Sequence, residues 1–232
     1  MFDWEPLWLT LRLAAVTTAC LLALGVPLAY TLAFGRWRGK IIAEVLVSMP
    51  LVLPPTVIGF YLLLLFSPAN SLGRWLQAQG IHLAFSFPGL VLASIVYSLP
   101  FMVQPILSGF RSLPESLTEA AQTLGKSPWQ ILKNVQLPNI RPALLTGAVL
   151  TFAHTIGEFG VVLMIGGNIP GKTRVASIQV YDEVEAMNYD SAHQYAAILF
   201  VISFVILLAV YLTNRLQAQG RWMDIVNWKK EL

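Results

Sequence analysis

His154 and Glu158 are the ionisable side chains best placed for chemistry in the apolar part of this sequence. They are four residues apart, so a helix would carry both on one face, with Thr151 and Thr155 nearby. Inside a bilayer a charged side chain costs about 2.5–3.5 kcal/mol on insertion scales, and such residues usually face a cavity or a partner. Two interpretations stay open: the pair lines the path or gate of a solute, or it only ties helices together.

A second stretch satisfies the pattern of a phosphate-binding loop, G-x-x-x-x-G-K-[ST], over residues 166–173. Such a loop works by presenting backbone N–H groups between a buried strand and the N-terminus of a helix. Here a long apolar segment precedes the pattern, and Pro170 removes one N–H group from it. The sequence therefore favours an ordinary connection over a nucleotide site.

Patterns typical of enzymes are not found in the sequence. It contains no H-E-x-x-H motif, and its three histidines (His82, His154 and His193) lie far apart. No nucleophile and base stand at a spacing that would support catalysis. We expect a chain that is not an enzyme and that binds no metal or cofactor of its own.

The elements that must position these residues are membrane spans. Of the 232 residues, 56% are hydrophobic and 12% charged, against about 45–50% and about 25% in soluble domains. A helix needs about 20 mainly apolar residues to cross the hydrocarbon core. We therefore expect an all-α membrane protein, a single domain over residues 1–232, with about five spans. They are Leu13–Phe34, Ile41–Phe66, Pro88–Phe110, Pro142–Ile165 and Tyr195–Leu212.

The positive charges predict how these spans are oriented. Eleven of the 15 Lys and Arg residues follow the first, third or fifth span, and four lie on the other side. Cytoplasmic loops carry an excess of Lys and Arg, so the N-terminus should lie outside, with residues 111–141 and the C-terminus in the cytoplasm. Because the cations are scattered at span ends, the net charge of +3 does not indicate nucleic-acid binding.

The second span is unusual because it contains Pro50, Pro54 and Pro55. Each proline removes a helix N–H donor and clashes with the preceding turn. In lipid the freed carbonyl groups must be satisfied by neighbouring helices, side chains or a wet cavity. Pro54 and Pro55 are therefore candidates, with His154 and Glu158, for the translocation pathway or its gate; the alternative is a packing kink.

Residues 111–141 predict a short helical hairpin. Ser112 with Glu115, and Ser127 with Gln130, have the spacing of capping boxes that begin a helix. Gly125 between them supplies a left-handed stop. Leu137-Pro138 should end the second helix. The segment would present a face of small residues, Ala120 and Ala121, that a partner can approach closely.

The same segment contains a specific pattern: Glu119-Ala120-Ala121, three residues, Gly125, nine residues, then Val135-Gln136-Leu137-Pro138. With average residue usage, its six specified residues would recur by chance with a probability of roughly 10⁻⁵ to 10⁻⁴. The pattern resembles the cytoplasmic coupling loop of ABC importer permeases, with Val135 in place of an isoleucine. The resemblance implies that Glu119, Ala120, Ala121, Gly125, Leu137 and Pro138 contact a separate ATPase subunit, which uses the ATP and Mg²⁺.

Further stretches resemble the molybdate permeases of this family. They are residues 50–55 (PLVLPP), 85–87 (FSF), 123–125 (TLG), 157–160 (GEFG) and 167–174 (GNIPGKTR). The resemblance implies a type I importer permease in the bacterial inner membrane that works as a homodimer. Its partners would be two cytoplasmic ATPase subunits and an extracytoplasmic binding protein that delivers molybdate, with tungstate as a second candidate.

Two alternatives remain at this point. Sulfate permeases share the general pattern, so the oxyanion is not fixed by the resemblance. In another class, a proton-coupled secondary transporter could use His154 and Glu158 as a relay. Inverted repeats would be the mark of such a transporter, and five unequal spans show none. The connections 67–87 and 166–194 are candidates for docking the binding protein, or are plain solvated loops.

Overall fold

The computed structural model describes residues 2–228, and for residues 213–228 it describes the backbone alone. Every regular element in this part of the chain is a helix, as the composition predicts. Three helices are long and apolar enough to span a bilayer: α1 (Glu5–Phe34), α5 (Phe87–Arg111) and α12 (Tyr189–Trp228, with its apolar part at Tyr189–Leu212). The first and last begin before the predicted windows, because a helix can continue past the apolar residues by which a window is recognised.

The second and fourth spans are broken helices, not the continuous windows that the sequence suggests. In the second, α2 (Lys40–Ser48) and a 3₁₀ turn, η1 (Met49–Leu51), lead to α3 (Pro55–Phe66) through a bend of 111°. In the fourth, α9 (Arg141–Gly157) and α10 (Gly160–Gly166) meet at 61°. With each bent pair counted as one span, the chain has up to five spans, which agrees with the predicted number.

The first break has the cause that the prolines predict. Pro54 is extended, with ψ of 136°, and α3 starts at Pro55, where a missing N–H is tolerated. The second break has no proline in it. Glu158 is extended (φ −68°, ψ 130°), and the helix resumes at Gly160. Glycines flank this break on both sides (Gly157 and Gly160), and the Ser177 hydroxyl of α11 donates to the Glu158 carbonyl within it.

The two broken spans pack against each other. A Cβ built on Gly160 would lie 3.0 Å from Cγ of Pro55, and one built on Gly59 would lie 3.1 Å from the backbone Cα of Val161. The glycines thus allow α3 and α10 to approach at backbone distance. This contact helps to bury the break at Glu158, whereas Pro54 at the other break stays exposed. Irregular backbone in a membrane is tolerated where protein buries it or where it lines a wet cavity.

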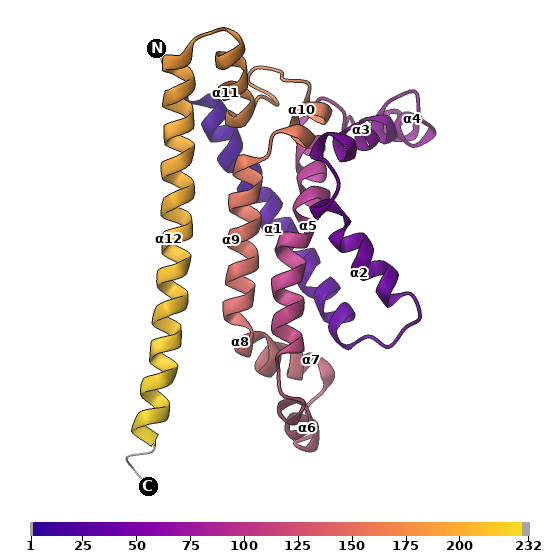
Figure 1. The fold of residues 1–232 in the computed structure, drawn as a ribbon. Coiled ribbons are helices and arrows are strands. Elements are labelled where there is room, and N and C mark those ends of the chain that lie inside the picture. The colour runs from indigo at the N-terminus through magenta and orange to yellow at the C-terminus, as the bar shows by residue number, and fades with distance from the viewer. Residues whose placement is uncertain (1, 229–232) are drawn as a thin grey trace.

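The remaining bundle is α1, α5 and α9 around a buried apolar core that includes Leu21, Met102, Ile106 and Phe110. In Figure 1 the long α12 stands to one side, and the end at which it begins meets α11 (Ala176–Glu185). There the Tyr195 hydroxyl donates to the Asp3 carbonyl at 2.6 Å.

Short helices lie at both ends of the bundle. At the end that holds the N-terminus are α11 and α4 (Ser71–Ala78) (Figure 1). At the opposite end are the elements of the hairpin: α6 (Glu115–Thr123), α7 (Pro128–Ile131), a π-helix η2 (Leu132–Gln136) and α8 (Leu137–Asn139). The hairpin and the far end of α12 therefore share one side, as the charge distribution requires.

We expect Gly59→Ala to destabilise the fold by about 1–3 kcal/mol, because the added methyl group overpacks the contact between α3 and α10. A Cβ there would lie 2.7 Å from Cβ of Met164, with the Val161 backbone behind it. The measurement is the unfolding temperature of the purified chain in detergent. Gly157→Ala is the matched control, since a Cβ at Gly157 meets nothing within 4 Å. Equal shifts in the two variants would contradict the proposed close packing.

Candidate functional site

The hairpin turns at Gly125, as the sequence predicts. Its φ of +69° is the left-handed conformation that suits glycine, and a side chain there would meet open space. The second arm then begins with the predicted capping box. The Gln130 N–H donates to the Ser127 hydroxyl at 3.3 Å, and the Ser127 N–H donates to the Gln130 side-chain oxygen at 3.0 Å. Both orphan donors at the start of α7 are thereby satisfied.

The first predicted capping box is wrong. The Ser112 hydroxyl donates to the Gly109 carbonyl at 2.8 Å, so it belongs to the end of α5. Pro114 is extended, with ψ of 134°, and α6 begins after it at Glu115 without a side-chain cap. The extended proline separates Ser112 from the first turn of α6, which is why the spacing alone misled the assignment.

The second arm does not end at Leu137-Pro138 either. The chain widens into a π-helix, where the Leu137 N–H donates to Leu132, five residues back. Pro138 has no N–H to donate, and a wide turn is one way to include it. The Asn139 side chain then donates to the Val135 carbonyl at 2.7 Å. The arm continues through α8 almost directly into α9, which begins at Arg141. The hairpin is thus joined to spans at both ends.

The small-residue face is divided by the fold. Ala121 is buried against the second arm, whereas Glu119 and Ala120 are exposed. Gln136 is buried as well, and its amide donates to the Thr118 hydroxyl of the first arm at 3.4 Å. Leu137 and Pro138 are half-buried. The residues of the motif therefore divide into those that hold the hairpin together and those that a partner can touch.

Two exposed apolar side chains at the hairpin escaped the sequence reasoning. Leu124 is 77% exposed and Trp129 is 69% exposed. They flank the Gly125 turn, next to the exposed part of the motif. Apolar residues in an otherwise polar loop were the signal that could have identified them. Together with Glu119 and Ala120 they form the accessible surface of the hairpin, which we call the hairpin tip.

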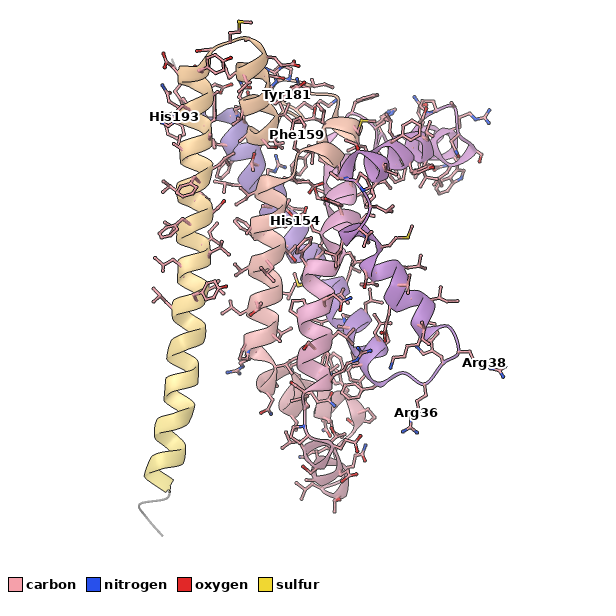
Figure 2. All side chains as sticks on the ribbon, in the orientation of Figure 1. Arg36, Arg38, His154, Phe159, Tyr181 and His193 are labelled. Atoms are coloured by element: carbon pink, nitrogen blue, oxygen red, sulfur yellow. The ribbon has the colours of Figure 1, made fainter. Side chains whose placement is uncertain are left out.

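The structure does not bring His154 and Glu158 into contact with each other as an ion pair or by a hydrogen bond among the described residues. His154 stacks on Phe101 of α5, with ring centroids 3.9 Å apart, and Figure 2 shows it on α9. Glu158 lies at the break after α9 and is 3% exposed, with Ser94 beside its carboxyl group. The two residues therefore have different neighbours, and whether they line a solute path or only tie helices together stays a prediction.

Glu158 instead belongs to the place where the broken spans meet. Its carbonyl accepts a hydrogen bond of 2.6 Å from the Ser177 hydroxyl, and its carboxylate oxygens have no hydrogen-bond partner in residues 2–212. Two residues further on, Gly160 packs on Pro55. Pro54, by contrast, is exposed. Three of the four candidate pathway residues thus come from the two breaks. His154 lies one turn before Glu158 on α9.

The stretch that matches a phosphate-binding loop is built for another purpose. The Thr173 hydroxyl, fully buried, donates to the Gly166 carbonyl at 2.7 Å and accepts from the Ile169 N–H at 2.9 Å. Arg174 contacts Asn168 at 2.6 Å and forms an ion pair with Asp182 of α11 at 3.3 Å. The element before the loop is the seven-residue half-helix α10, not a strand. The groups that would hold phosphate are used to close the loop and fasten it to α11.

No group of three or more His, Cys, Asp or Glu side chains in the described residues could hold a metal ion. What the fold and the site define is a polytopic helical membrane protein with broken spans and an accessible hairpin at one face. These features are typical of a transport subunit that is driven by a separate partner protein bound to the hairpin. The comparisons with known proteins agree.

Residues 23–220 match the family of the binding-protein-dependent transport system inner membrane component, and the chain belongs to this family. It is 48% identical to the molybdenum transport system permease protein ModB of Azotobacter vinelandii, over 93% of this chain and 96% of that protein. It is 36% identical to a probable sulfate transport system permease protein of Zygnema circumcarinatum, over 88% of this chain and 69% of that protein.

Solved structures agree on the fold. An inward-facing MetNI methionine ABC transporter matches with a TM-score of 0.70 and 18% identity, over 90% of this chain and 93% of that one. The chain is accordingly an ABC importer permease of type I architecture, located in a membrane. The family model and the structural match thus confirm the class of protein that the hairpin motif predicts.

We expect Thr173→Val to lower the unfolding temperature of the purified chain, because it leaves the Gly166 carbonyl and the Ile169 N–H without their partner. Leaving such buried groups unsatisfied costs about 1–3 kcal/mol. Thr173→Ser keeps the hydroxyl and should restore most of the loss. Lys172→Met alters an exposed side chain and should leave the unfolding temperature unchanged. A nucleotide-binding loop would need that lysine to bind its ligand.

Proposed function

We propose that this chain is the membrane subunit of an importer for molybdate, with tungstate as a second cargo. The observation that carries the proposal is the 48% identity, over nearly the full length of both chains, to the molybdenum permease of Azotobacter vinelandii. The stretches that resemble molybdate permeases also support it: 50–55 and 157–160 lie at the two breaks, 85–87 at the start of α5, 123–125 at the hairpin turn and 167–174 in the α10–α11 loop.

A sulfate importer is the second candidate. The 36% identity to the probable sulfate permease of Zygnema circumcarinatum favours it. Molybdate, tungstate and sulfate are all tetrahedral dianions, so one path can serve any of them. Selection would then fall to the binding protein that delivers the anion, and the permease needs no tight anion site of its own.

In this proposal two copies of the chain form the path, with the N-terminus outside and the hairpin and C-terminus in the cytoplasm. A separate ATPase subunit grips each hairpin tip. Because the hairpin continues into α5 on one side and α9 on the other, a displacement of the tip moves two spans at once. Broken spans at the other end of those helices are the elements that such a movement would rearrange.

The outer end of the bundle is the proposed docking surface for the binding protein. It comprises α4, α11 and the loop between α10 and α11. Arg174, Asn168 and Asp182 fix that loop in one conformation, so Pro170 and Lys172 at its exposed tip are presented without an ordering cost. A direct relay of protons between His154 and Glu158 is disfavoured, because no hydrogen bond joins the two side chains.

Uptake by proteoliposomes tests the substrate. The vesicles hold this chain with its ATPase and binding protein, and the measurement compares radiolabelled molybdate, tungstate and sulfate at equal concentrations. We expect ATP-dependent accumulation of molybdate and tungstate in preference to sulfate. Preferred uptake of sulfate would replace the proposal by its second candidate, and accumulation without the ATPase would contradict the class of mechanism.

We expect Glu119→Arg to weaken binding of the ATPase while the chain still inserts in the membrane, because it reverses an exposed charge at the hairpin tip. Gly125→Arg should do the same by placing a bulky side chain at the turn. The measurement is the amount of ATPase that purifies with the tagged permease. Glu115→Arg reverses an exposed charge on the same helix, outside the motif, and should retain the ATPase. Equal retention by all three variants would contradict the coupling role.

A further inference from the structure

Arg12 is an exposed positive charge near the start of α1, a helix that is long and apolar enough to span the membrane. Trp4, Trp8 and Arg12 stand four residues apart, which places them on one face of the helix. The two tryptophans are 65% and 69% exposed. Tryptophans on a spanning helix are typical of the boundary between lipid and water. This face of α1 therefore crosses that boundary close to Arg12.

The contact of Arg12 with α5 gives its depth more closely. The guanidinium carbon lies 4.6 Å from the centroid of the Phe87 ring, and Phe87 is the first residue of α5. In both helices the apolar window begins one residue later, at Leu13 in α1 and at Pro88 in α5. Two spans thus place the charge at the same level, the edge of the hydrocarbon layer where lipid headgroups lie.

The guanidinium of Arg12 has no partner of opposite charge in the part of the chain that the structure describes. There it donates no hydrogen bond and has no carboxylate at ion-pair distance. The Phe87 ring offers only its π face. An arginine has five N–H donors in a planar fork, which matches the oxygens of a phosphate in pairs. These donors are available to an anion at the level of the headgroups.

A hollow with apolar walls runs along α1 beside the arginine. Its walls are Trp8, Leu11, Arg12, Ala15 and Val16 of α1 and Phe152 of α9. Residues 8–16 cover about 12 Å of helix. The stem of an arginine is apolar, so it can form part of such a wall while its charged end turns to the membrane surface. The hollow suits an alkyl chain and offers little to a water-soluble anion.

We infer that this hollow binds one phospholipid with a net negative headgroup. Arg12 holds the phosphate, and an acyl chain lies along α1 against Phe152 of α9. The positive charge, its depth and the apolar walls each match one part of such a lipid. A headgroup that also carries an ammonium group repels Arg12, so phosphatidylglycerol should bind more tightly than phosphatidylethanolamine. The inference does not depend on which solute the chain transports.

A second copy of the chain fits this face less well than a lipid does. In a symmetric contact through the hollow, α1 and α9 of one copy would meet the same helices of the other. These two helices contain a single carboxylate, that of Glu5, which lies two turns from Arg12 along α1. Covering Arg12 with protein would therefore bury a charge without a nearby partner, which is costly.

The test measures binding of the first lipid to the purified chain in detergent by native mass spectrometry. Phosphatidylglycerol and phosphatidylethanolamine are titrated separately, and inorganic phosphate is added as a competitor. We expect phosphatidylglycerol to bind at the lower concentration and inorganic phosphate not to displace it. Arg12→Gln should raise the apparent Kd for phosphatidylglycerol roughly tenfold, the factor that one charge-assisted hydrogen bond supplies.

Two further variants separate charge from shape. Arg38→Gln removes an equal charge from the exposed loop between α1 and α2, at the opposite end of the bundle (Figure 2), and should bind the first lipid as the parent chain does. Ala15→Phe fills the hollow and keeps the charge, and it should also weaken binding. Because Ala15 is exposed, this variant tests the site even where Arg12→Gln fails to fold.

Three results would overturn the inference. The first is equal binding of phosphatidylglycerol by Arg12→Gln and the parent chain, or by Ala15→Phe and the parent chain. The second is displacement of the lipid by inorganic phosphate, which would make Arg12 a site for a soluble anion. The third is a change from dimer to monomer in Arg12→Gln with lipid binding intact, which would make this face a contact between copies.

Discussion

Backbone groups inside a membrane must find partners within the protein, and the arrangement of this chain depends on how two broken spans meet that requirement. The break at Pro54 and the break at Glu158 lie where α3 and α10 pack together. Gly59 and Gly160 make the approach possible, since any larger residue would meet Val161 or Pro55. The break at Glu158 is thus buried in protein, whereas Pro54 at the other break stays exposed.

The same contact relates the interior of the bundle to the hairpin. Helix α9 runs from the second arm of the hairpin to Glu158, and α5 runs from its first arm to the core beside His154. A π-helix carries Pro138 without stopping the chain. The second arm therefore leads almost without interruption to the break at Glu158, whereas extended Pro114 separates the first arm from α5. Gln104 and Arg111 of α5 also donate to Ser48 and Glu44 of α2.

Much of this could be predicted from residues alone. The apolar windows gave the number of spans, and Pro54-Pro55 indicated the first break. Gly125 and the box of Ser127 with Gln130 fixed the turn of the hairpin. The box at Ser112 failed because an extended proline intervenes, and the break at Glu158 was missed because it contains no proline. The contacts of Arg111 with Glu44 and of Gln104 with Ser48 were missed because each joins residues of two different spans.

Local chemistry explains the difference. A cap, a left-handed glycine and a run of apolar residues involve a few neighbours in the chain, so the sequence by itself determined the helices, the hairpin turn and the family motif. The bend at Glu158, the burial of Ala121 and the partners of Glu44 depend on residues distant in sequence. Only the tertiary structure decided these features, because the free energy of a buried contact depends on which distant side chain packs against it.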